Sequence, residues 1–130
     1  MRLGLSTPEI RMIGMGILYI LILMSGFFLS RLGRPLNTAV FTIHKLVSIA
    51  AVIVLLMTII QINRTTPLNG LTWAALVATG IFFLGEMISG GFLSFDNFNT
   101  KYILTIHRIL PVLIILFTTL SFYLIYGKNR

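Results

Sequence analysis

Long apolar stretches with few charges, separated by short polar segments, make up most of this chain of 130 residues. Apolar stretches of about 18 or more residues are typical of membrane-spanning helices. The pattern predicts four such helices, over residues 12–30, 39–61, 71–94 and 102–126. The short connections favour antiparallel neighbours. The predicted fold is therefore all-α: an integral membrane up-down four-helix bundle, forming a single transmembrane domain over residues 1–130.

The polar residues recur in the same order in the two halves of the chain. The first predicted helix ends with "SGFFLS" (residues 25–30), and the third ends with "SGGFLS" (residues 89–94). An Asn-Thr pair follows each motif (residues 37–38 and 99–100), and then "TIHK" or "TIHR". Apolar motifs match easily by chance, but Ser, Gly, Asn, Thr and His in one order predict a duplicated helical hairpin. A two-helix unit returns the chain to its starting side, so the copies should be parallel.

Composition and charge agree with a membrane protein. Hydrophobic residues make up 57% of the chain and charged residues 10%, whereas soluble domains are near half apolar and about a quarter charged. The net charge of +7 comes from basic residues scattered near helix ends, which suits a lipid bilayer with anionic headgroups and not nucleic acid. The absence of cysteine excludes disulfides and thiolate metal sites. The loop Lys and Arg residues predict a multi-pass membrane protein with both termini in the cytoplasm.

The candidate ligands are His44 and His107, which are the only histidines of the chain and occupy the two repeated motifs. If the four helices form a ring in chain order, the second and fourth are diagonal partners, with axes roughly 13 Å apart. Two facing imidazoles would then leave room for a metal ion. Ionisable residues within a membrane are costly and are functional candidates. We therefore predict that both histidines are axial ligands of one haem iron; the alternative is that each only hydrogen-bonds a neighbouring carbonyl.

Four neighbours of the histidines are candidate cofactor-binding residues. Gly26 and Gly90 are expected near the depth of the histidines, where a missing side chain lets a planar ring approach the backbone. Small-residue helix packing would also explain them. Lys45 and Arg108 directly follow the histidines, and they could extend to the membrane surface and pair with haem propionates. Simple anchoring at the headgroups is the alternative.

Glu86 breaks the repeat, because its counterpart in the first half is the apolar residue Ile22. An unpaired ionised carboxylate inside a membrane is expensive, so Glu86 should be protonated or partnered. It could accept a histidine N–H, pair with Arg108 or Lys45, or pass a proton. A structural ion pair is the simplest interpretation, and the sequence leaves these alternatives open.

The four-helix layout and the two "TIH[KR]" motifs resemble small bacterial membrane-bound b-type cytochromes, whose haem irons are held by histidines on different helices. The resemblance implies haem b with His44 and His107 as ligands, electron transport, and quinone or a redox protein as partner. Members with two haems need two histidine pairs, and this chain has one. The resemblance therefore does not imply electron transfer across the whole membrane.

Two other functions remain open at this point. One is a cofactor-free small membrane protein that acts as an assembly partner or regulator. The other is a metal or proton carrier that uses His44, His107 and Glu86. No Gly-rich phosphate loop, Ser-His-Asp set or paired carboxylates occur, so no catalytic residue is identified. The short polar loops are too small to seal off a site, and a homodimer is a further expectation.

Overall fold

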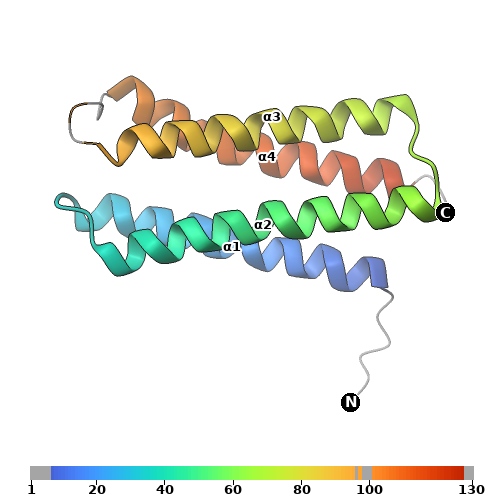
Figure 1. The fold of residues 1–130 in the computed structure, drawn as a ribbon, viewed down its shortest axis with the longest axis horizontal. Coiled ribbons are helices and arrows are strands. Elements are labelled where there is room, and N and C mark those ends of the chain that lie inside the picture. Colours follow the sequence, from blue (N-terminus) through green and yellow to red (C-terminus); the bar gives the residue numbers. More distant parts are fainter. Residues whose placement is uncertain (1–6, 96, 98–100, 128–130) are drawn as a thin grey trace, which may run out of the picture. The chain divides into compact units, whose positions relative to one another are not determined.

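The computed structural model describes residues 7–95, 97 and 101–127, and in this part of the chain four long α-helices are present and no β-strand (Figure 1). The helices are α1 (Thr7–Leu32), α2 (Thr38–Thr65), α3 (Gly70–Leu93) and α4 (Lys101–Tyr126). The prediction of an all-α chain with four long apolar helices is confirmed. α1 and α2 extend beyond their predicted bounds by several residues at one end, because the helix continues past the apolar stretch, whereas the ends of α3 and α4 lie within one residue of the prediction.

Each helix is long and apolar enough to cross a membrane. The shortest, α3, has 24 residues, and at about 1.5 Å per residue this corresponds to about 36 Å. The hydrocarbon core of a bilayer is about 30 Å thick. Large apolar side chains also cover the outside of the helices; Met57, for example, is 65% exposed. These features fit a multi-pass membrane protein, in which such side chains face lipid.

The chain divides into two compact units at Pro67 and Leu68. In the first unit α1 packs against α2, and in the second unit α3 packs against α4. Each unit is a pair of antiparallel helices joined by a short connection (Figure 1). We call them hairpin 1 (α1 and α2) and hairpin 2 (α3 and α4), and each is described by itself.

Local chemistry sets the helix ends. The Asn37 side chain caps α2 by accepting from the Val40 N–H at 3.1 Å, and Asn69 caps α3 by accepting from the Thr72 N–H at 2.8 Å. Gly33 follows α1 with a φ of 72°, in the left-handed region that favours glycine after a helix. Asn99 and Thr100, the repeat partners of the Asn-Thr pair before α2, lie outside the described residues.

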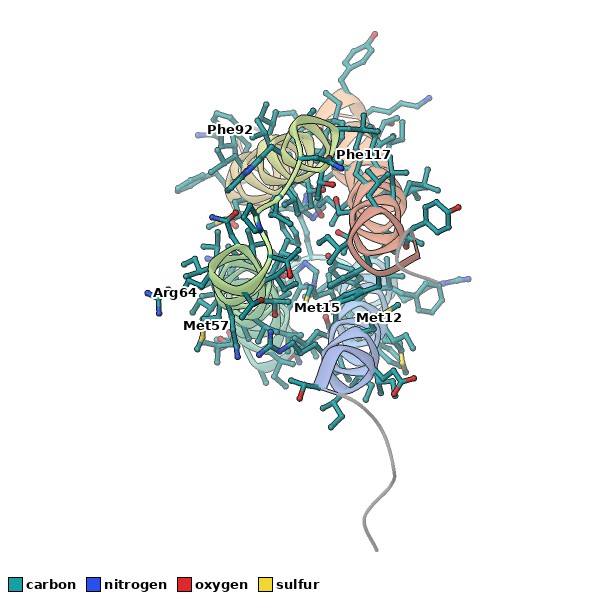
Figure 2. The ribbon with its side chains drawn as sticks, turned by 90° about the vertical axis from the view of Figure 1, so that its right-hand side faces the viewer. Met12, Met15, Met57, Arg64, Phe92 and Phe117 are labelled. Atoms are coloured by element: carbon teal, nitrogen blue, oxygen red, sulfur yellow. The ribbon has the colours of Figure 1, made fainter. Side chains whose placement is uncertain are left out.

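The buried positions of the hairpins combine apolar and small hydroxyl side chains. Met15 of α1 is 1% exposed, whereas Met57 of α2 points away from α1 (Figure 2). Thr58 and Thr79 are buried, and each hydroxyl donates to a carbonyl oxygen one turn earlier in its own helix, at 2.7 Å and 2.9 Å. These bonds satisfy the buried polar groups locally. Small side chains at such positions allow close helix packing in a membrane.

Candidate functional site

His44 lies near the beginning of α2, and its imidazole packs against α1. Its Nδ1 atom is 2.9 Å from Ser25 Oγ. Ser25 is buried, and its hydroxyl donates to the Ile22 carbonyl oxygen at 3.0 Å. The histidine is therefore held to the neighbouring helix by a side chain that is itself anchored to the backbone.

This arrangement favours one tautomer of the His44 ring. A serine hydroxyl has one hydrogen, and Ser25 gives that hydrogen to the carbonyl of Ile22. Toward His44, the Ser25 oxygen can then only accept, which favours the tautomer with the proton on Nδ1. In the neutral imidazole the lone pair lies on Nε2. Nε2 is the nitrogen that can bind a metal while Nδ1–H holds the ring in place.

Hairpin 2 contains the same arrangement. Ser89 Oγ is 2.9 Å from His107 Nδ1, and the Ser89 hydroxyl donates to the Glu86 carbonyl oxygen at 3.0 Å. The same reasoning favours the His107 tautomer with the proton on Nδ1 and the lone pair on Nε2. Both histidines also lie six residues after the first residue of their helices, Thr38 and Lys101, or about 9 Å along the axis. The repeat in the sequence is thus a repeat in side-chain hydrogen bonds.

The two glycines lie against the imidazole rings. A Cβ at Gly26 would be 3.2 Å from His44 Cε1, and a Cβ at Gly90 would be 2.9 Å from His107 Cε1. Since real Cβ contacts are essentially never shorter than 3.0 Å, any side chain at Gly90 would displace the ring. Both glycines therefore make room for the histidine. Their predicted approach to a planar cofactor stays a prediction.

Glu86 lies next to the histidine of hairpin 2. Its Oε1 atom is 3.3 Å from His107 Nδ1, and the side chains of Glu86 and His107 are 13% and 19% exposed. Glu86 Oε2 is buried and has no hydrogen-bond partner among the described residues. Of the contacts that the sequence leaves open for Glu86, the structure provides the one with the histidine. Ile22, the counterpart in hairpin 1, is also buried.

The two basic residues that follow the histidines are both exposed. The Lys45 ammonium lies 4.2 Å from the centre of the Phe41 ring, one turn closer to the beginning of α2. The charge is therefore directed toward the polar end of the helix, as expected for a basic residue near a membrane surface. The pairing of Lys45 and Arg108 with haem propionates stays a prediction.

The sequence identified the two histidines but assigned no role to Ser25 and Ser89. Both serines were part of the repeated motif, directly before the glycines. Their spacing from the histidines was not informative, because an apolar helix does not reveal which of its sides faces a neighbour. The one signal in the sequence that could have identified the two serines is that each directly precedes one of the repeated glycines.

The described residues include no group of three or more His, Asp or Glu side chains that could hold a metal ion. A haem requires less from the protein, since the porphyrin provides four nitrogens and the chain supplies only axial ligands. Comparisons with known proteins find no matching family model, no similar curated protein and no similar solved structure. A functional proposal must therefore begin from the two Ser–His pairs.

Proposed function

We propose that the protein is a membrane haem-binding electron-transfer protein, in which His44 and His107 ligate one b-type haem. The observation that supports this most is the pair of Ser–His hydrogen bonds, each 2.9 Å long. Metal-ligating histidines almost always donate their second ring N–H to an oxygen, which fixes the tautomer and raises the basicity of the ligating nitrogen. Both histidines of this chain meet that condition, and each does so within its own hairpin.

The residues around the two histidines would have separate roles in the proposed site. Ser25 and Ser89 hold the imidazoles, and Gly26 and Gly90 leave space for them. The haem would supply a one-electron redox centre, and quinone or a redox protein is the proposed electron partner. Because both histidines are close to the beginning of a helix, the site is proposed to lie near one face of a bacterial cell membrane. Both termini are proposed to be cytoplasmic.

Absorption spectroscopy of the protein purified in detergent from haem-replete cells tests this proposal. The expected result is a Soret band with sharp α and β bands after reduction. His44→Ala and His107→Ala should each abolish this low-spin spectrum, because each removes one axial ligand. Met57→Ala, at an exposed position, is the matched control and should keep it. A colourless wild-type protein, or a histidine variant with an unchanged spectrum, contradicts the proposal.

The Glu86–His107 pair favours a second candidate, a metal or proton carrier that uses His44, His107 and Glu86. A carboxylate oxygen 3.3 Å from an imidazole nitrogen is an arrangement that can bind a cation or transfer a proton. Reconstitution into liposomes distinguishes the candidates. A colourless protein that conducts protons or metal ions, and stops doing so as Glu86→Gln, supports the carrier. A colourless protein without transport favours an assembly partner or regulator.

A further inference from the structure

The two histidines have the same serine and glycine neighbours but differ in one further contact. In hairpin 2, the Nδ1–H of His107 faces two oxygens, Ser89 Oγ at 2.9 Å and Glu86 Oε1 at 3.3 Å. In hairpin 1 the position equivalent to Glu86 is the apolar residue Ile22, which offers His44 a backbone carbonyl oxygen but no carboxyl group. The repeat therefore presents two imidazoles with unequal hydrogen-bond acceptors.

We propose that Glu86 is a positioning residue that makes His107 the more electron-rich of the two imidazoles. An acceptor on Nδ1–H shifts electron density toward Nε2, and the carboxyl group of Glu86, when ionised, is a stronger acceptor than a hydroxyl. His107 then becomes the stronger haem ligand and stabilises the oxidised iron. This last consequence rests on the proposed function, whereas the inequality of the two rings does not.

The surroundings of Glu86 argue against a mainly structural role. Its Oε2 atom is buried and has no hydrogen-bond partner among the described residues. An unsatisfied buried polar atom destabilises a fold, so replacing Glu86 by the apolar residue of the other hairpin should not lower stability. If Glu86 only stabilised the hairpin, the same replacement would lower the free energy of unfolding. The role of the carboxyl group then lies in its effect on the imidazole beside it.

Nuclear magnetic resonance of the haem-free, full-length protein with ¹⁵N-labelled histidine tests the inequality directly. In the wild type, the Nδ1–H proton of His107 should resonate further downfield than that of His44, because of its stronger acceptor. Glu86→Ile should bring the two signals together, and Glu86→Gln, whose amide oxygen can still accept, should give an intermediate shift. Glu9→Gln, which removes an exposed carboxylate near the beginning of α1, is the control and should shift neither. An unchanged His107 signal in Glu86→Ile overturns the proposal.

The haem-bound protein provides the second test. Glu86→Ile should weaken haem binding ten- to a hundredfold, as is typical when a hydrogen-bond partner of a metal-ligating histidine is removed. It should also raise the midpoint potential, by about 59 mV for each tenfold change in the redox equilibrium. Ile22→Glu, which adds a carboxylate beside His44, should lower the potential. If haem binds and Glu86→Ile leaves the potential unchanged, this inference fails while the proposed function stands. If no haem binds, the proposed function fails, and the resonance measurement still decides the inference.

Discussion

The contact between Gly90 and His107 allows a prediction in which one added methyl group is compared at two adjacent positions. In Gly90→Ala, the new Cβ would be 2.9 Å from His107 Cε1. In Gly91→Ala, the new Cβ would meet no atom of the described chain within 4 Å, apart from its own helix and chain neighbours. Both glycines lie inside α3, so both substitutions change the intrinsic helix propensity in the same way.

The expected magnitudes follow from these distances. Alanine is favoured over glycine inside a helix by about 1 kcal/mol, so Gly91→Ala should be as stable as the wild type or up to about that much more stable. At Gly90 the imidazole must move by several tenths of an ångström. Overpacking of this kind costs about 1–3 kcal/mol, and weakening the Ser89–His107 hydrogen bond adds about 0.5–1.5 kcal/mol. Gly90→Ala should therefore be about 1.5–4.5 kcal/mol less stable than Gly91→Ala.

Equilibrium unfolding in mixed micelles, followed by circular dichroism, measures this difference. Gly26→Ala should fall between the two variants, because its Cβ would lie 3.2 Å from His44 Cε1 and the ring needs to move less. The histidine resonances provide the second readout: Gly90→Ala should change the His107 signals and leave those of His44 in place. Equal stability of Gly90→Ala and Gly91→Ala, with His107 unperturbed, would refute the packing argument.

Three further variants test other contacts of the described residues. Ser89→Ala should destabilise hairpin 2 by about 1–3 kcal/mol, because the part-buried Nδ1–H of His107 loses its nearest acceptor. The control is Thr119→Ala, which removes an exposed hydroxyl bonded to its own helix. A similar loss of stability in both variants would contradict the Ser–His assignment. Asn69→Ala should cost about 1 kcal/mol through loss of the α3 cap, and Asn69→Asp, which keeps an acceptor, should restore it in the same unfolding assay. Thr79→Leu should cost about 1–3 kcal/mol, because Thr79 is fully buried and the larger side chain has no space; a stability equal to that of Thr79→Ser would show that the site can expand.

The helices of this protein could be predicted from the sequence because each one coincides with a long run of apolar residues. A bilayer requires about 20 consecutive apolar residues, and the four stretches are visible without any knowledge of packing. The hairpin pairing follows from the short connections in the same way. The exact helix ends were less predictable. The polar residues before Met12 and after Gln61 continue α1 and α2 as helix, although they lie outside the apolar stretches.

The candidate site was only partly predictable. His44 and His107 stand out because they are ionisable and repeated, but the partner of each depends on the rotation of helices that are apolar on all sides. Such helices give no pattern from which the facing side can be read. The side chain of Glu86 can reach more than one neighbour, so its contact with His107 depends on packing. The haem, its electron partner and the orientation in the membrane stay predictions.

The serine and the glycine that contact each histidine belong to the same hairpin as that histidine. The serine that holds the ring is locked by a carbonyl of its own helix, and the glycine beneath the ring belongs to that helix too. Each imidazole is therefore oriented before anything binds it, and little side-chain freedom is left to be lost later. A circularly permuted gene that encodes α3–α4 ahead of α1–α2 should still produce both oriented rings, since neither depends on which half is translated first.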